Sequence, residues 1–388
     1  MSEERACIED IPLVLYFSIP FCSGVADPYA QRTSFVGGGD TKAAYMEALT
    51  REFNASIERG DVIGRRVEAV CFGGGGPSVM SPDHIGKLAL GVRRSIELPP
   101  GCEFGIEVQP YTVGVPSLSG WGIAKFNRIN LHVGSLVDAE LQTIHANHSV
   151  EDVQNAVLFL DKFHANNLDV SIAFGLPSQT EMSLRRTLRS CMAFEPRHVT
   201  LQLWQSNESR FVASRRYVDE PDKRRLLEHY LCACDYLESQ GFEQYAYNCF
   251  VRGSARSAYR EARYRGVDVL GFGAGAKSCY DGYRFESTSD FSSYIAAPTE
   301  YENIISSVVE EDAPAFEART VNGLLSLCEG FTEIGYERAF SNPLTHSAHS
   351  YLDRLISEGL LAEREYSYSL TPEGRLSWFF LQNDNFLE

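Results

Sequence analysis

The stretches LYFSIPFC at residues 15–22 and FGGGGPSVMSPDHI at residues 72–85 decide the fold. The first is a short apolar run that ends in a proline and a cysteine. The second connects another apolar run, through four glycines, to Ser81-Pro82-Asp83, which is a typical helix start. Short runs of this kind, rich in Val, Ile, Leu and Phe, are typical of parallel strands that are covered on both faces.

Further apolar runs extend this pattern through the first two hundred residues. The predicted strands are 13–19, 67–74, 103–109, 126–133, 168–176 and 198–205. The predicted helices between them are 41–58, 83–97, 150–166 and 181–193. Six consecutive βα units predict an α/β fold, a partial (β/α)6 TIM-like barrel with right-handed crossovers. Barrels of this kind carry their chemistry at the carboxyl ends of the strands.

The pattern changes after residue 210, and it predicts three domains. The barrel occupies 1–215, an extension that packs on the barrel occupies 216–300, and a mostly helical, winged-helix-like domain occupies 301–388. The last boundary is placed within 297–315, because this segment is acidic and contains proline.

The composition narrows the classes of function. The chain has 388 residues and a net charge of −17, which argues against a nucleic-acid partner and an anionic membrane surface. It shows neither a signal peptide nor a run of about 20 apolar residues that would span a membrane. Its ten cysteines are scattered, so we expect a cytoplasmic protein with reduced thiols and a small-molecule substrate. The sequence sets no expectation for the oligomeric state.

Five segments, in order, resemble one protein family. They are LYFSIPFC (15–22), FGGGGPSVMSPDHI (72–85), IEVQP (106–110), FNRINLHVGS (126–135) and FGLPSQT (174–180), followed by VLGFGAGAKS (269–278). This set is similar to the oxygen-independent coproporphyrinogen III oxidases of the radical S-adenosylmethionine (SAM) superfamily. Their relatives include heme chaperones and HemN-like methyltransferases. The resemblance runs from about residue 13 to the C-terminus.

The resemblance implies an iron–sulfur site that this sequence does not complete. Members of the family carry a C-x3-C-x2-C loop whose three thiolates hold a [4Fe–4S] cluster. Here the loop keeps Cys22, while Ala26 and Tyr29 stand at the second and third cysteine positions. Iron in such a cluster requires thiolate ligands. We therefore expect no cluster, no other metal site and no radical chemistry. The pair Cys232 and Cys234 is interpreted as core thiols.

The resemblance also implies a binding site for SAM. The positions that would contact it are Tyr16, Gly74, Gly75, Gly76, Glu107, Ser171 and Trp204. Glycines suit this task because their backbone approaches a ligand without interference from Cβ. Three polar family positions are replaced, by Gly134, Ala146 and Ser171, which removes charge-assisted contacts. SAM is the expected cofactor, and the alternative is that another ligand has taken its site.

Three residues are predicted to be catalytic: Glu107, His132 and Tyr29. A histidine near the carboxyl end of a barrel strand is a candidate general base, because its pKa lies near the operating pH. Tyr29 either fills the space of the lost cluster or contacts a substrate.

Three other residues are open to a functional or a structural interpretation, and a fourth is interpreted as having no function. His145 and His148 are candidate bases or helix-capping residues, and Arg128 is a ligand contact or a structural ion pair. Cys22 is interpreted as a relic of the cluster loop.

These features lead to one main hypothesis and two alternatives. The main hypothesis is an enzyme that uses the barrel for polar chemistry, namely SAM-dependent alkyl transfer or intramolecular displacement in specialised metabolism, since SAM is an electrophile. The first alternative is a heme- or tetrapyrrole-binding, chaperone-like protein. Against it, SAYREARY at 257–264 stands in place of the family's HNxxYW and lacks its histidine. The second alternative is a catalytically silent partner of an active homologue.

Overall fold

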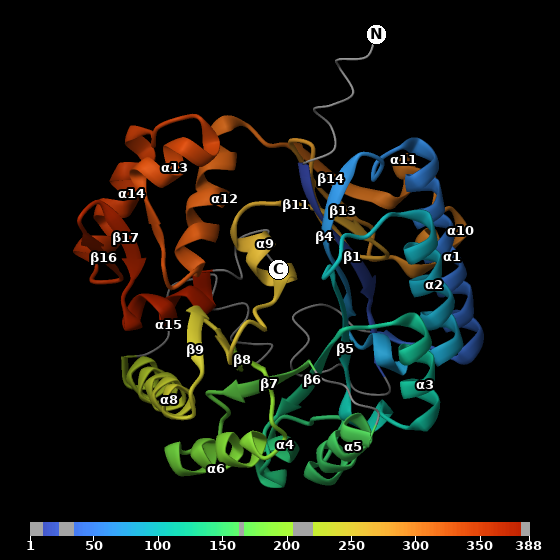
Figure 1. Cartoon of the computed structure of the whole chain (residues 1–388), viewed down its shortest axis with the longest axis horizontal. Coiled ribbons are helices and arrows are strands. Elements are labelled where there is room, and N and C mark those ends of the chain that lie inside the picture. Colours follow the sequence, from blue (N-terminus) through green and yellow to red (C-terminus); the bar gives the residue numbers. More distant parts are fainter. Residues whose placement is uncertain (1–10, 23–34, 163–166, 205–219, 382–388) are drawn as a thin grey trace.

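The computed structural model describes residues 11–22, 35–162, 167–204 and 220–381 (Figure 1). Ala26 and Tyr29 of the cluster loop lie outside these ranges. The predicted partial (β/α)6 barrel is confirmed. Its six parallel strands are adjacent in the order β1-β4-β5-β6-β7-β8. They are β1 (Ile11–Ile19), β4 (Arg65–Gly74), β5 (Glu103–Val108), β6 (Arg128–Gly134), β7 (Leu168–Phe174) and β8 (His198–Leu203).

Helices cover the outer face of this curved sheet, as Figure 1 shows. The four predicted ones are α1 (Gly39–Arg59), α2 (Pro82–Ser95), α5 (Val150–Lys162) and α6 (Glu181–Met192). Ser81 and Thr180 cap α2 and α6 through their side-chain oxygens. Two further helices, α3 (Val115–Ala124) and α4 (Asp138–Thr143), were not predicted. The first is rich in small and apolar residues, and the second is only six residues long.

Along the strands, apolar side chains that face outward alternate with polar side chains that face the inside of the barrel. In β6, Leu131 and Val133 pack with the helices in the main core, whereas Arg128, Asn130 and His132 lie on the opposite face. The same alternation in β5, β7 and β8 lines the inside of the barrel with polar side chains. They are Glu103, Glu107, Gln109, Asp169, Ser171, His198 and Thr200.

The segment after the barrel strands extends the sheet at both edges. After α8 (Glu220–Ser239), β9 (Glu243–Ala246) and β10 (Cys249–Val251) add antiparallel strands beside β8. The glycine-rich stretch forms β11 (Asp268–Phe272), which pairs in parallel with β1. Three antiparallel strands continue this edge: β12 (Lys277–Tyr280), β13 (Tyr283–Ser287) and β14 (Ile305–Glu310). The extension thus contributes strands to the barrel sheet, and β14 continues this sheet beyond the predicted boundary at residue 300.

One short helix of the extension, α9 (Ala258–Tyr264), lies near the centre of the molecule in Figure 1. Its residue Ala262 packs against Val14 of β1 and Ala69 of β4, whose side chains point into the barrel. On its other side α9 contacts α12 (Ala313–Ser326). A Cβ on Gly323 of α12 would lie 2.3 Å from the carbonyl oxygen of Tyr264, so glycine permits this close contact.

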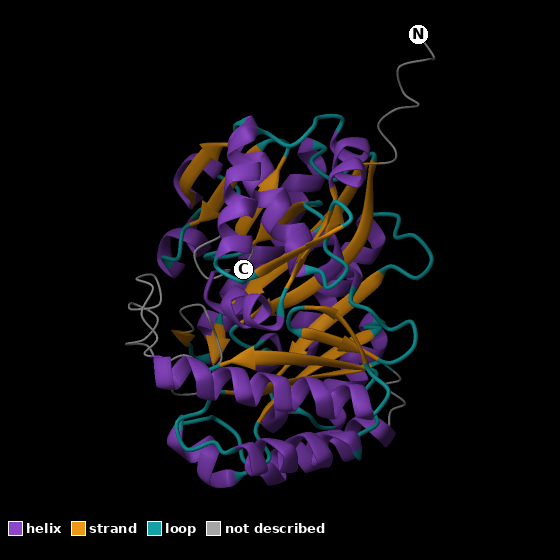
Figure 2. Ribbon diagram, turned by 90° about the vertical axis from the view of Figure 1, so that its left-hand side faces the viewer, coloured by secondary structure: helices purple, strands orange, loops and turns teal. Residues whose placement is uncertain are grey.

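The C-terminal part has the predicted order of a helix, a strand pair and a final helix (Figure 1). Figure 2 shows the molecule from the side, with helices packed against the strands. These elements are α14 (His346–Ser357), β16 (Leu361–Arg364), β17 (Ser367–Leu370) and α15 (Pro372–Leu381). Before them come α12, the short strand β15 (Phe331–Thr332), which pairs with β17, and α13 (Glu333–Phe340). Within the described ranges no helix has the length and apolar character of a membrane span.

A buried carboxylate fixes the loop after β11 on the rest of the fold. Glu52 of α1 accepts hydrogen bonds from the Gly273 amide at 2.8 Å and the Tyr294 hydroxyl at 2.5 Å. Gly273 has a φ of +103° and passes so close to Ser18 that a Cβ would lie 2.5 Å from the Ser18 carbonyl oxygen. Burial raises the pKa of Glu52 to about 7.

This raised pKa predicts a pH dependence of stability. Between the unfolded pKa and about 7, the folded chain holds a proton on Glu52 that the unfolded chain has lost. The free energy of unfolding should therefore fall as the pH rises through this window, by on the order of 3 kcal/mol in all. Denaturant unfolding of Glu52→Gln across the window should lack this fall, whereas the exposed control Glu47→Gln should retain it. Parallel profiles for wild type and Glu52→Gln would show that Glu52 does not titrate in this way.

Candidate functional site

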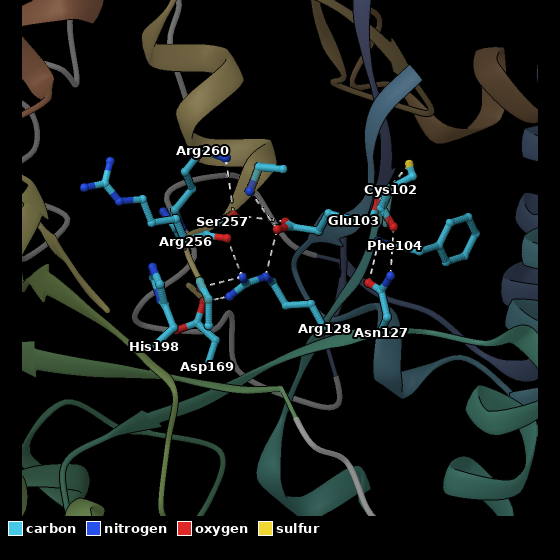
Figure 3. A network of polar contacts seen from close by, with 12 residues as sticks. Cys102, Glu103, Phe104, Asn127, Arg128, Asp169, His198, Arg256, Ser257 and Arg260 are labelled. Atoms are coloured by element: carbon cyan, nitrogen blue, oxygen red, sulfur yellow. Dashed lines mark hydrogen bonds and ion pairs between the residues drawn. The ribbon is translucent and has the colours of Figure 1, made fainter. Parts of the chain in front are cut away.

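The amino ends of the barrel strands are closed by a buried network, shown in Figure 3. Arg128 donates from Nε to Glu103 at 2.8 Å, and from Nη2 to the carbonyl oxygens of Ala255 and Arg256 at 2.8 Å each. Glu103 also accepts from the Ser257 hydroxyl at 2.9 Å and the Ala258 amide at 2.8 Å. Arg128 thus has the structural role that was one of its two predicted interpretations. We call Glu103, Arg128, Asp169, His198 and Ser257 the floor network.

Asp169 and His198 form the second half of the floor network. Asp169 Oδ1 lies 2.8 Å from His198 Nδ1, and His198 Nε2 lies 2.8 Å from the Tyr245 hydroxyl. Burial alone would raise the pKa of Asp169, but the His198 imidazole holds it below its ordinary value. Burial alone would lower the pKa of His198, and Asp169 raises it above its ordinary value. Both residues are fully buried, so this ion pair stabilises the floor rather than meeting a ligand from outside.

Above the floor, the predicted SAM residues Tyr16, Gly74 and Glu107 come together. Glu107 Oε2 accepts from the Gly74 amide at 3.1 Å. A Cβ on the adjacent Gly73 would lie 2.8 Å from the Tyr16 hydroxyl and 2.9 Å from the Glu107 carboxylate. Tyr16 and Glu107 therefore meet over a backbone that only glycine leaves open. Across the barrel Tyr16 stacks on Tyr259 of α9, with ring centroids 5.9 Å apart.

The remaining glycines lie one level nearer the carboxyl ends. The amides of Gly75 and Gly76 both donate to the carbonyl oxygen of Ile19, at 3.2 and 3.4 Å. Gln109 donates from Nε2 to the Gly75 carbonyl oxygen at 3.3 Å and lies 3.4 Å from His132 Nδ1. The glycine run and His132 therefore share one polar level. Gln109 belongs to the IEVQP motif, for which the sequence predicts no role of this residue. Its spacing of two from Glu107 is the signal that places both side chains inside the barrel.

Cys71 is an inward-facing thiol that the sequence did not single out. Burial, and then the nearby Glu107 and Glu103 carboxylates, raise its pKa well above the ordinary value. Arg260 and Arg263 of α9 act in the opposite direction from the other side of the barrel. The residue therefore stays a neutral thiol at physiological pH and is neither a thiolate ligand nor a nucleophile.

Two predicted site residues make contacts within the protein. Ser171 is fully buried and donates to Asn130 Oδ1 at 2.8 Å. Trp204, directly after β8, packs with Ala146 on an apolar cluster of Ile144, Ala173 and Leu176. Ala146, the position where the resemblance implies an arginine, therefore has apolar surroundings.

His145 and His148 lie in different environments. His148 is buried, and its Nε2 lies 3.0 Å from the carbonyl oxygen of Val133, which supports the structural interpretation. His145 is exposed after α4, with a φ of +54°. Of the predicted histidines, His132 faces the barrel interior.

Cys22 is the cysteine that the sequence keeps in the cluster loop. Cys22 is buried at the end of β2 (Phe21–Cys22), which pairs with β3 (Phe35–Val36). Among the described residues no three His, Cys, Asp or Glu side chains gather as a metal site. Ala26 and Tyr29 lie outside those residues, so the loss of the cluster stays a prediction from the donor set. One thiolate does not suit a four-iron cluster.

Comparison with known structures defines the class of fold. Coproporphyrinogen III oxidase (HemN) from Escherichia coli, a radical SAM enzyme, superposes on the chain with a TM-score of 0.77 and 19% identity. The match covers 98% of this chain and 92% of that structure. The fold is therefore that of a HemN-like radical SAM protein over almost the whole chain. No protein-family profile matches the sequence.

Sequence relatives narrow the resemblance. The chain is 24% identical to heme chaperone HemW from Lactococcus lactis over 373 residues, 94% of each protein. It is 28% identical to a mitochondrial radical SAM domain-containing protein from Bos taurus, over 68% of this chain and 59% of that protein. It is 24% identical to oxygen-independent coproporphyrinogen III oxidase from Cereibacter sphaeroides, over 74% of this chain. The predicted resemblance to HemN- and HemW-like members of the radical SAM superfamily is confirmed.

These relatives overturn the main functional hypothesis. Those that match most of the chain are named a heme chaperone and a coproporphyrinogen III oxidase. Polar SAM-dependent alkyl transfer or displacement was therefore the wrong choice, and the tetrapyrrole alternative is favoured.

The floor network generates a stability prediction. Arg128→Met leaves the Glu103 carboxylate buried without its cation, so the free energy of unfolding should fall by about 3–5 kcal/mol. The control is Arg185→Met, which removes an exposed pair with Glu181 and should change it by less than about 1 kcal/mol. Denaturant unfolding measures both, and equal small effects would mean that the floor network is not what holds α9.

Proposed function

We propose that this chain is a tetrapyrrole-binding, heme-chaperone-like protein whose ligand site is the inside of the barrel, between the carboxyl-end level of His132 and α9. The observation that carries the proposal is the similarity to HemW over 94% of both chains, which includes the extension and the C-terminal elements. Binding and delivery of a tetrapyrrole need no bond-breaking chemistry, so the proposal does not depend on an iron–sulfur cluster.

The inward-facing residues fit heme in two respects. Tyr16 and Tyr259 form a stacked aromatic pair inside the barrel, and flat apolar rings favour such surfaces. Heme iron is ligated in proteins by histidine, cysteine thiolate, methionine or tyrosine. His198 is of this type but is already paired with Asp169 in the floor network. The other donors of these types that we consider in the described barrel interior are His132, Tyr16, Tyr259 and Cys71.

Among these donors we assign the iron contact to His132. Cys71 stays protonated, as its raised pKa requires, and a thiol is a poor iron ligand. The rings of Tyr16 and Tyr259 stack on each other, and the Tyr259 hydroxyl accepts a hydrogen bond from Arg263. His132 lies near the end of β6, and its Nδ1 faces the Gln109 amide, a neighbour that can orient the ring. Bound heme would supply an iron centre, and the chain would hold and orient it.

Titration of the full-length protein with heme tests this proposal. A saturable shift of the Soret band at about one heme per chain is expected. His132→Ala should move the Soret band and weaken binding by about tenfold or more, because an axial ligand is lost. The exposed neighbour His145→Ala is the matched control and should bind like wild type. If heme gave no saturable shift, the proposed function would be wrong; if His132→Ala matched wild type, only the iron contact would be reassigned.

We further propose that SAM, the cofactor expected from the superfamily, binds at Tyr16, Glu107 and the Gly73–Gly74 backbone. The supporting feature is the close meeting of Tyr16 and Glu107 over Gly73. The carboxylate is placed to hold a cationic group, and the glycine leaves the backbone open to it.

A glycine substitution tests the SAM site. Gly73→Ala places a methyl group against Tyr16 and Glu107 and displaces both, so calorimetry should show SAM affinity falling by about tenfold or more. Gly91→Ala in α2 is the matched control, because a Cβ there meets nothing within 4 Å. Unchanged SAM affinity in Gly73→Ala would place SAM elsewhere or exclude it.

A further inference from the structure

Arg260 of α9 is a cation inside the barrel for which neither the floor network nor the proposed heme contact has a use. Its electrostatic neighbours come from several elements. They are Cys249 of β10, Asp169 of β7, Tyr264 of α9, Tyr245 of β9 and Cys71 of β4. Each of these neighbours is itself buried. Arg260 therefore lies among the barrel strands. Figure 3 agrees with this position, because it shows Arg260 on α9 beside the floor network.

The Arg260 guanidinium has no hydrogen bond or ion pair with any residue that the structure describes. Its backbone amide donates to the Ser257 hydroxyl, and no bond of the side chain accompanies it. The other charged groups of the floor are paired: Glu103 with Arg128 at 2.8 Å, and Asp169 with His198 at 2.8 Å. Arg260 is half-buried rather than fully buried, so the five donors of its guanidinium are available to a ligand.

We propose that Arg260 is an anion-binding residue that takes a carboxylate of the bound ligand inside the barrel. This proposal rests on the proposed function, and the carboxylate that Arg260 would bind is a propionate-type group at the edge of a tetrapyrrole. A planar guanidinium binds a carboxylate through two parallel hydrogen bonds, which fixes orientation as well as adding affinity. Arg263, one turn along α9, donates from Nη1 to the Tyr259 hydroxyl at 3.1 Å and orders the aromatic ring beside this anion site.

A purely structural role for Arg260 gives a different expectation. Asp169 is the one carboxylate among its main electrostatic neighbours, and it already has His198 at 2.8 Å. If Arg260 only balanced Asp169 through space, its replacement would lower stability and leave ligand preference unchanged. Discrimination between a free carboxylate and its ester therefore separates the two roles.

The test compares iron-free protoporphyrin with its dimethyl ester, in which both carboxylates are blocked, using the full-length chain and fluorescence titration. Wild type should bind the free acid about tenfold more tightly than the ester, and Arg260→Gln should lose this preference. Arg260→Lys should keep part of it, because the charge remains while the bidentate geometry is lost. Arg265→Gln, an exposed arginine directly after α9, is the matched control and should behave like wild type. An unchanged preference in Arg260→Gln would overturn the proposal.

A second readout keeps this inference separate from the proposed function. Glutarate, a small dicarboxylate, should raise the melting temperature of wild type, Arg260→Lys and Arg265→Gln, but not that of Arg260→Gln. If neither heme nor protoporphyrin bound and the glutarate effect still required Arg260, the tetrapyrrole function would fail while the anion site stood. If glutarate had no effect on wild type in that case, or acted equally on all variants, the anion site would fail as well.

Discussion

The contact between Glu103 and Arg128 is the constraint on which the interior of this barrel depends. Each residue begins a neighbouring strand, and together they hold the segment that leads into α9 through Ala255, Arg256 and Ser257. Both side chains are buried, so the pair is costly to form and more costly to break. Because α9 is fixed at the amino ends of the strands, its side chains are presented to the inside of the barrel. The aromatic pair and the unpaired guanidinium of α9 follow from this one attachment.

Much of the fold was predictable from the sequence, since the six apolar runs agree with β1 and β4–β8 to within two residues at each end. Their periodicity reports burial directly. The return of β11 beside β1 was not predictable, because 269–278 is rich in glycine, and its pairing depends on a contact between segments about 250 residues apart. The position of α9 was not predictable either, because the sequence of a seven-residue helix does not indicate which elements it packs against.

The candidate site was predicted best where a glycine backbone and a charged side chain lie on neighbouring strands. Glu107, Gly74 and Tyr16 come together as expected, since each ends or precedes the end of a neighbouring strand. Trp204 and Ser171 were assigned to a ligand although they pack or hydrogen-bond within the protein. Both lie near strand ends, where strand position alone does not distinguish a contact with a ligand from one with the chain. Arg260 could not be singled out, because an arginine in a helix is expected at the surface until the fold shows which elements surround it.

The central claim is that a tetrapyrrole binds inside the barrel, between the end of β6 and α9. A crystal structure of the full chain grown with heme tests it most directly. The account predicts heme inside the barrel, with the His132 ring facing the iron and a propionate at Arg260. Heme bound on the outer surface, or a barrel interior filled by the protein's own side chains when heme is present, would contradict it.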